Sequence, residues 1–368
     1  MWYKIKALDT LFFRDGRPFT MGSESWANPV FPPYPSTVYG AIRTWLIFEK
    51  GNLKEFREGK YKEELGTPSE KGNLKIKGPF ICLDNNIYFP VPFDSLKKKG
   101  ATQSEKNNLF YIACINKPEI FISDYHLESI LINRNDFELE ECDGFINIDS
   151  LKNYLIQSNE VLQFTEKKEI FLEEKKTGIK KSRKTLSSEE GYLYRIPMVK
   201  LKKEASLLIE IDGISNCPGS GLLQIGGEGK TVKIEKKESD NQLMTLMDIK
   251  FKFENKIFKL YLATSAIFEN GWLPRWVNKS TFEGEYKGIK VKLVSCAIGK
   301  FNLIGGWDLA NKRPKPMYKA VPAGSVYYFK ILDNAPPEKI KENFHLKNIS
   351  DINPEEGFGL SFVGEVKE

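Results

Sequence analysis

The sequence contains few of the residues that carry most enzymatic chemistry. Histidine occurs only twice in 368 residues, at His126 and His345, and neither lies beside a glycine-rich or basic segment. Metal-independent RNA cleavage usually needs a group whose pKa is near neutrality, and histidine fills that role most often. We therefore expect each histidine to be a surface residue or a hydrogen-bonded core residue. No H-E-x-x-H or G-x-S-x-G motif is present.

Cysteine is also scarce, and long apolar runs are missing. The five cysteines are widely spaced without a C-x-x-C pair, which predicts free thiols in a reducing cytoplasm and no zinc site. No run of about 18 apolar residues occurs, which excludes a membrane-spanning helix, and the first residues show no secretory signal. Paired acids such as Glu173-Glu174 lie in polar segments, so we expect no metal site and no cofactor.

Positive charge is concentrated in two segments, although the net charge is only +6. Lys175–Lys184 holds six cations and no acid, and Lys312–Lys319 holds four cations and no acid. Only nine of the 55 basic residues are arginine, and lysine favours diffuse contact with phosphates over bidentate reading of bases. Each segment fits a phosphate-binding surface or an ordinary solvated face, and the sequence leaves both interpretations open.

A glycine-rich segment, Gly221–Val232 (GLLQIGGEGKTV), is the clearest local pattern. Glycines without Cβ atoms let successive N–H groups turn outward and bind a phosphate or a sugar. Backbone amides of Gly226, Gly227 and Gly229, together with Lys230, are the candidate phosphate ligands. The alternative is a glycine-rich hairpin that binds no ligand.

The same segment departs from a nucleotide-binding P-loop. A Walker A motif would need glycine at position 224, which is Gln224, and it would open a helix. Thr231–Lys236 instead alternates apolar and polar residues, which predicts a strand. The segment therefore indicates strand, glycine loop and strand, and it disfavours an NTPase.

The order of elements predicts an α+β fold of two ferredoxin-like (RRM-like) βαββαβ domains with insertions, at residues 1–240 and 241–368. Four-stranded antiparallel sheets of this kind often bind RNA, and aromatic side chains on them stack unpaired bases. The sequence assigns that role to no particular aromatic residue. The expected elements are strands at Trp2–Leu8, Pro79–Pro92 (a pair), Gly191–Ile211, Ile249–Phe253, Ile257–Leu262, Ile289–Val294, Val326–Leu332 and Gly359–Val363, and helices from the Ser36-Thr37 cap to Lys50, at Ile148–Ile156 and at Pro337–Phe344.

Six strings in a fixed order resemble one protein family. They are LFFRDGRPF (11–19), TGIKKSRKTLSSEEGYLY (177–194), the glycine-rich segment, GGWD (305–308), PKPMYKAVPAGSVYYF (314–329) and GFGLSFVG (357–364). Their succession resembles the third-subunit family of type III-B CRISPR (Cmr) effector complexes, in the RAMP superfamily. Single glycine loops are unspecific, whereas the ordered set is specific and spans nearly the whole chain.

The resemblance implies two ferredoxin-like domains, a projecting β-hairpin and a place in a ribonucleoprotein. In that family the subunit holds the 5′ tag of the guide RNA (crRNA). Its neighbours are the large palm-polymerase subunit and the first stacked backbone subunit, which carry the catalytic activities. The chain is then expected to be non-catalytic.

The family pattern also places charged residues. The basic string T-G-I-x-x-x-R-K-T is expected on the hairpin or at its base, although Ser182 stands where related sequences often have aspartate. Independently of the family pattern, the basic segment Lys312–Lys319 is expected to form a second basic surface nearer the carboxyl end. The cations expected to contact RNA are Lys180, Lys181, Arg183 and Lys184 on the hairpin and Arg313, Lys315 and Lys319 on the second surface.

Two other functions stay open from the sequence. One is a RAMP-type endoribonuclease that processes CRISPR repeat RNA, with Tyr34 or Tyr39 and a lysine as its general base. The other is a structural subunit whose basic segments face acidic protein partners.

Overall fold

The computed structural model describes residues 1–17, 29–100, 108–158, 161–182, 184, 185, 187–238, 241–253, 255–308 and 312–367. The chain divides into two compact units that interleave along the sequence. Unit 1 comprises Met1–Asp84, Lys168–Glu238 and Leu303–Lys319; unit 2 comprises Asn85–Lys167, Ser239–Asn302 and Ala320–Glu368. None of the helices that the structure describes is long and apolar enough to span a membrane.

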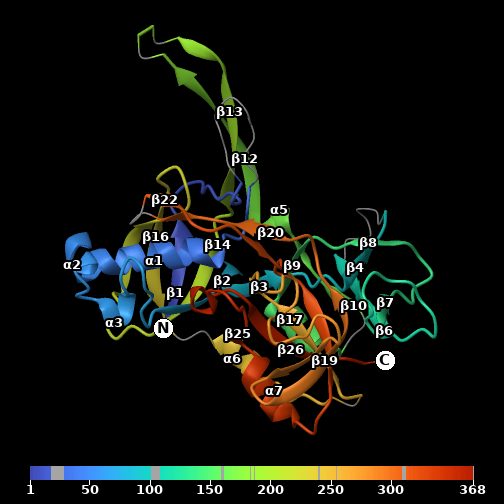
Figure 1. Cartoon of the computed structure of the whole chain (residues 1–368). Coiled ribbons are helices and arrows are strands. Elements are labelled where there is room, and N and C mark those ends of the chain that lie inside the picture. Colours follow the sequence, from blue (N-terminus) through green and yellow to red (C-terminus); the bar gives the residue numbers. More distant parts are fainter. Residues whose placement is uncertain are drawn as a thin grey trace. The chain divides into compact units, whose positions relative to one another are not determined.

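Unit 1 is built on an antiparallel sheet with one long helix, α1, packed on it (Figure 1). The apolar side chains of α1 recur at helical spacing, and the ring centroids of Trp45 and of Tyr3 on β1 lie 6.0 Å apart in a T-shaped arrangement. The strand order is β2-β14-β1-β16-β15. The elements are β1 (Trp2–Ala7), α1 (Pro35–Lys50), α2 (Leu53–Arg57), α3 (Lys62–Leu65), β2 (Lys75–Leu83), β14 (Ala205–Asp212), β15 (Ser220–Gln224) and β16 (Thr231–Lys237).

The expected first strand and first helix are confirmed, but the expected helix cap is wrong. The helix begins at Pro35, one residue before Ser36, and its N-cap is Tyr34, whose side chain makes no capping hydrogen bond. Proline suits the first helical turn because its φ is already helical and its missing N–H would have no partner there. The Pro35 ring therefore decides where the helix starts.

A long hairpin forms the second part of unit 1. Strands β12 (Phe171–Lys181) and β13 (Ser188–Leu201) pair from Phe171↔Leu201 to Lys181↔Ser188 (Figure 1). Residues 172–177 of β12 are all exposed, whereas Ile196, Met198 and Val199 of the paired strand are buried. The base of the hairpin therefore packs on the core through β13. The expected hairpin is confirmed. The single strand expected at Gly191–Ile211 is wrong, because a turn after Leu201 separates β13 from β14.

Unit 2 is built on a six-stranded antiparallel sheet of order β18-β19-β24-β17-β26-β25. Aromatic side chains fill its core: Phe258, Phe329 and Phe344 are fully buried. The elements of this sheet and its helices are β17 (Ile257–Leu262), β18 (Glu283–Tyr286), β19 (Ile289–Ala297), β24 (Val326–Ile331), α7 (Pro337–Phe344), β25 (Lys347–Asn348), the 3-10 turn η1 (Pro354–Glu356) and β26 (Leu360–Glu365).

Smaller elements complete unit 2 and the junctions. Helix α4 is capped by Asn147, whose side chain accepts a hydrogen bond from the Ser150 amide at 2.8 Å. The remaining elements are β3 (Asn86–Pro90), β4 (Ser95–Lys98), β5 (Leu109–Ile112), β6 (Cys114–Asn116), β7 (Ile130–Ile132), β8 (Leu139–Glu141), β9 (Gly144–Asn147), α4 (Ile148–Leu155), β10 (Val161–Gln163), β11 (Thr165–Glu166), α5 (Lys167–Ile170) and α6 (Asn241–Met247).

The fold is mixed, with mostly strands and few helices, as expected for an α+β protein. The two ferredoxin-like repeats and the division at residue 240 stay predictions. The strand expected at Ile249–Phe253 is wrong, because the Lys252 amide donates to the Glu365 side chain at 2.7 Å instead of to a neighbouring strand.

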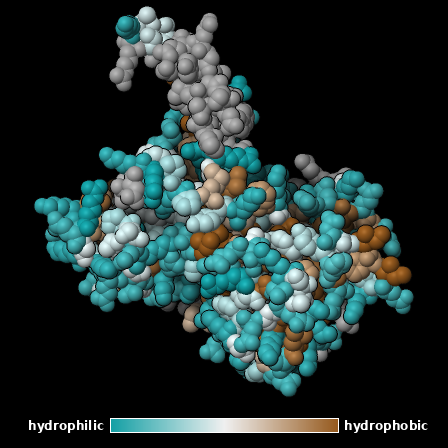
Figure 2. Space-filling view, in the orientation of Figure 1, coloured by the Kyte–Doolittle hydropathy of each residue, from teal (hydrophilic) through white to brown (hydrophobic). Residues whose placement is uncertain are grey.

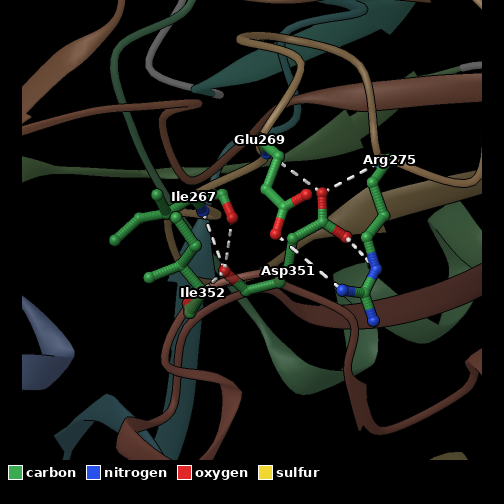
Figure 3. Close-up of polar contacts among 6 residues, drawn as sticks. Ile267, Glu269, Arg275, Asp351 and Ile352 are labelled. Carbon is green, nitrogen blue, oxygen red and sulfur yellow. Dashed lines mark hydrogen bonds and ion pairs between the residues drawn. The ribbon is translucent and has the colours of Figure 1, made fainter.

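An acidic side chain fixes one loop of unit 2 (Figure 3). Asp351 accepts hydrogen bonds from the backbone amides of Glu269 at 3.1 Å and Arg275 at 2.8 Å, and its carboxylate lies 3.8 Å from the Arg275 Nε. Burial raises the pKa of Asp351. Its oxygens are therefore used to hold the loop, and the cluster is structural.

Candidate nucleic-acid interface

The segment Leu11–Arg17 connects the parts of unit 1 that the sequence singled out. The amide and carbonyl of Leu11 each form a 2.7 Å hydrogen bond with Val199, on β13 at the base of the hairpin. Phe12 is buried together with Ile196 and Met198 of the same strand. The hairpin is thus anchored to this segment by backbone pairing and by apolar contact.

The glycine loop between β15 and β16 packs directly on the same segment. The Gly227 amide donates to the Phe12 carbonyl at 2.9 Å. Gly226 has φ +71°, and a Cβ there would lie 2.3 Å from the Phe12 oxygen. Gly226 is therefore required for close backbone packing, and the amide of Gly227 already has an intramolecular partner.

Lys230, at the end of the loop, also has partners within the chain. Its ammonium group lies 2.8 Å from a carboxylate oxygen of Asp9 and 3.2 Å from the Thr10 hydroxyl. The lysine side chain is only 17% exposed, and the hydrogen bond from Lys230 lowers the pKa of Asp9. The loop cation is thus neutralised locally. The expected strands on both sides of the loop are confirmed, which excludes a P-loop here.

A short ribbon joins the other side of the Leu11–Arg17 segment. The Gly16 amide donates to the Leu303 carbonyl at 3.0 Å, and a Cβ on Gly16 would lie 2.8 Å from the Gly305 nitrogen. We call residues 303–319 the basic ribbon. Its strands are β20 (Asn302–Ile304), which pairs with β23 (Tyr318–Ala320), and β21 (Trp307–Asp308), which pairs with β22 (Arg313–Pro314).

The basic ribbon carries exposed cations of the predicted set. Arg313, Lys315 and Lys319 are exposed, as is Lys312. Within the described ranges, neither Arg313 nor Lys315 forms an ion pair, in contrast to Lys230. Trp307, on the paired strand, is 55% exposed. The ribbon is therefore a positively charged surface with an exposed aromatic ring.

The described hairpin cations, Lys180, Lys181 and Lys184, lie at the far end of the hairpin from its base. Lys180 and Lys181 end β12, although their side chains lie outside what the structure describes, as does Arg183 entirely. Lys184 is exposed in the turn. The Ser182 hydroxyl accepts hydrogen bonds from the amides of Lys184 and Thr185, both at 3.3 Å. The Ser182 hydroxyl thus stabilises this turn by the same hydrogen bonds that the carboxylate of an aspartate at this position would accept.

The two histidines occupy the expected environments. His126 is exposed. His345 is 1% exposed; its Nδ1 accepts from the Val363 amide at 3.2 Å, and its Nε2 lies 3.0 Å from the Leu246 carbonyl. Burial lowers the pKa of His345 to about 4, so the ring is neutral at physiological pH.

The tyrosines considered as general bases are poorly suited to that role. Burial raises the pKa of Tyr34 to about 12, so its phenol keeps its proton at neutral pH. Tyr39 is 3% exposed in the core under α1. Among the residues that the structure describes, no group of three or more His, Cys, Asp or Glu side chains is arranged to hold a metal ion.

Comparison with known proteins first defines the class. Chains in two cryo-EM structures, of the type III-B Cmr-beta bound to cognate target RNA with AMPPnP and with target RNA alone, match with TM-scores of 0.51 and 0.50. Both matches have 18% identity and cover 89% of this chain and 86% of that chain. The fold is thus that of a chain found in a type III-B CRISPR complex.

The family follows from the sequence comparisons. A family model described as CRISPR-associated protein (Cas_Cmr3) matches residues 3–366. The CRISPR system CMR subunit Cmr3 of Saccharolobus solfataricus is 22% identical over 334 residues, which cover 89% of this chain and 86% of that protein. This chain belongs to the Cas_Cmr3 family, a subunit family of the type III-B Cmr complex, and the resemblance noted in the sequence is confirmed.

Two features of the interface were not predicted. Asp9, the partner of Lys230, is 221 positions away along the chain, so no local pattern connects them. Trp307 was one aromatic residue among many, and only its exposure distinguishes it.

Proposed function

We propose that this chain is the non-catalytic subunit that holds the 5′ tag of the crRNA in a type III-B Cmr complex. In this proposal it also docks the large palm-polymerase subunit to the backbone subunits. The observation that carries the proposal is the meeting of the hairpin base, the glycine loop and the basic ribbon on the Leu11–Arg17 segment of unit 1. The exposed cations of the basic ribbon lie on that frame, and within the described residues Arg313 and Lys315 form no ion pair.

The geometry divides the predicted RNA contacts into two groups. The first group lies on the basic ribbon and neutralises tag phosphates; it consists of Arg313, Lys315 and Lys319. The second group lies on the hairpin and contacts an adjacent part of the RNA strand; it consists of Lys180, Lys181, Arg183 and Lys184. The amides of Gly226 and Gly229 stay available as phosphate donors in the proposal. Gly227 and Lys230 act by positioning the loop, because their polar groups are bonded to Phe12 and Asp9.

A salt titration of tagged RNA binding to the assembled complex checks this proposal. If about five phosphates are neutralised, the log–log slope is roughly −3.5 for a single strand. Replacing Arg313 and Lys315 by alanine should make that slope shallower by roughly 1.4, because each lost contact contributes about 0.7. A Lys180/Lys181/Lys184 triple alanine variant should likewise make the salt slope shallower, because it removes cations of the hairpin.

A charge-matched control uses two exposed lysines of unit 2. Lys279→Ala with Lys347→Ala removes the same charge and should leave both affinity and slope unchanged. Equal effects of the two double variants would indicate nonspecific attraction and contradict the tag-binding role. RNA without the tag should bind the wild-type complex more weakly than tagged RNA.

The absence of catalysis is part of the proposal. Its support is the neutral, buried His345 and the high pKa of Tyr34. Incubation of the purified chain with CRISPR repeat RNA in EDTA should yield no discrete product. A discrete product that disappears in Tyr34→Phe would instead establish the endoribonuclease.

A candidate docking surface lies in unit 2, between β6 and β7. Ile120 is 88% exposed and Ile122 is 101% exposed, which is unusual for isoleucine in a soluble fold. Figure 2 shows a largely hydrophilic surface on which apolar side chains gather on part of unit 2. Neighbouring apolar side chains in water fit contact with a protein subunit of the complex.

A further inference from the structure

Trp307 presents an unusual combination of exposure and rigid attachment. The indole is 55% exposed, although tryptophan is highly buried on average. Within the described part of the chain, no aromatic ring or cation stacks on it. A large aromatic surface therefore faces water at a fixed point of unit 1.

The basic ribbon fixes the backbone under this ring. Trp307 is paired with Pro314, and Asp308 is paired with Arg313, across the two strands. The Lys315 amide donates to the Gly306 carbonyl at 2.9 Å, and the Gly16–Leu303 hydrogen bond ties the ribbon to the Leu11–Arg17 segment. The ring is thus presented by an ordered support.

The charged residues near Trp307 in the sequence are mostly positive. The exposed cations Lys312, Arg313, Lys315 and Lys319 follow it within twelve positions, and Asp308 is the acid next to it. The Lys315 side chain runs along Gly306, since a Cβ on that glycine would lie 3.4 Å from the lysine Cδ. Arg313 and Lys315 therefore flank Pro314, the residue that is paired with Trp307.

This arrangement matches the chemistry of unpaired nucleotides. A base stacks its face on an aromatic ring, and its phosphate is neutralised by nearby cations. Bases inside a duplex have both faces covered by their neighbours, so a lone exposed ring selects single strands. Acidic protein segments would use the cations but not the ring face.

We propose that Trp307 is a stacking platform for one unpaired base of single-stranded RNA, with Arg313 and Lys315 on the flanking phosphates. The inference rests on the proposed function and deepens it, because it names the residue that contacts a base of the tag. The base identity is not specified by stacking, since every base has a π face.

The test uses the assembled complex and tagged RNA that carries 2-aminopurine at one tag position at a time. Stacking on the indole should quench the fluorescence at one position, and Trp307→Ala should abolish that quenching. Trp307→Ala should weaken binding about 10- to 100-fold with an unchanged salt slope, because it removes a stack and no charge. Trp307→Phe should retain most of the affinity.

The outcomes separate this inference from the function on which it rests. If the wild-type complex does not prefer tagged RNA, the proposed function and the inference both fail. If it does, and Trp307→Ala binds and quenches like wild type, the stacking platform alone is overturned. If Trp307→Ala lowers incorporation of the subunit without changing RNA binding per complex, the ring is a protein contact and the inference is again overturned.

Discussion

The ammonium group of Lys230 lies 2.8 Å from the carboxylate of Asp9. This ion pair holds the glycine loop against the end of β1. It also neutralises the charge of Lys230, which the sequence predicted to bind phosphate. Charge available to RNA is therefore greater on the basic ribbon than on the glycine loop.

We expect Lys230→Ala to leave the salt slope of tagged RNA binding unchanged, since the variant removes an internally paired charge. Arg313→Ala should make the slope shallower by roughly 0.7. Filter binding of the assembled complex at several salt concentrations measures both. Equal slope changes for the two variants would show that the Asp9 pair opens and that Lys230 contacts phosphate.

Gly226→Ala should destabilise unit 1 by about 2 kcal/mol or more, because a Cβ would lie 2.3 Å from the Phe12 oxygen at a φ of +71°. Gly229→Ala, with φ +62° and open space, should cost only about 1 kcal/mol. Gly219→Ala, with neither constraint, is the neutral control. Urea unfolding followed by circular dichroism ranks the three. An order other than 226, 229, 219 would contradict the close packing.

Lys259 in unit 2 should make stability rise with pH in the alkaline range. Its ammonium lies 3.4 Å from the centre of the Tyr154 ring, and burial lowers its pKa to about 8 despite the attraction of Asp94 and Glu365. Between pH 8 and 10.5 the unfolded chain holds a proton that the folded chain has lost, so unfolding becomes less favourable as pH rises.

Comparison with Lys259→Met isolates this contribution from other titrating groups. The wild-type stability minus that of Lys259→Met should increase across the window by roughly 3 kcal/mol, as expected for a pKa shift of this size. Urea unfolding at several pH values measures it, with the exposed Lys279→Met as control. A constant difference would mean that Lys259 titrates normally.

Ile120→Ser with Ile122→Ser should reduce incorporation of the subunit into the complex without lowering its thermal stability. Both side chains are almost fully exposed, so the change costs little folding free energy and removes apolar contact area. Co-purification with the other subunits measures incorporation. Leu332→Ser, at 44% exposure in the same unit, is the control. Normal assembly of the double variant would place the subunit contact elsewhere.

Much of the fold follows from local patterns. The strand after the glycine loop, the helix at Pro337–Phe344 and the strand pair within Pro79–Pro92 were predicted from residue periodicity and turn residues. The prediction failed at Ile249–Phe253, where an apolar alternation is present but a side-chain contact with Glu365 replaces strand pairing. An alternation of apolar and polar residues indicates which side chains are buried, but it does not indicate which groups form hydrogen bonds with the backbone.

The candidate interface was predicted in composition but not in arrangement. The basic segments, the glycine loop and the ordered family strings are properties of the residues alone, and they were sufficient to identify the family. Which cations are available is a different question, because Lys230 is paired with a residue 221 positions away while Arg313 and Lys315 are not ion-paired in the described structure.

The sequence by itself therefore determined most element types, with Ile249–Phe253 as an exception, the scarcity of catalytic groups and the membership in the Cas_Cmr3 family. Tertiary structure alone decided that Gly226 packs on Phe12, that Asp9 neutralises Lys230 and that the Trp307 ring faces water. The physical reason is the difference in the distance over which these effects act. Periodicity and turn chemistry act over a few residues, whereas burial and ion pairing depend on distances in space that only the folded chain defines.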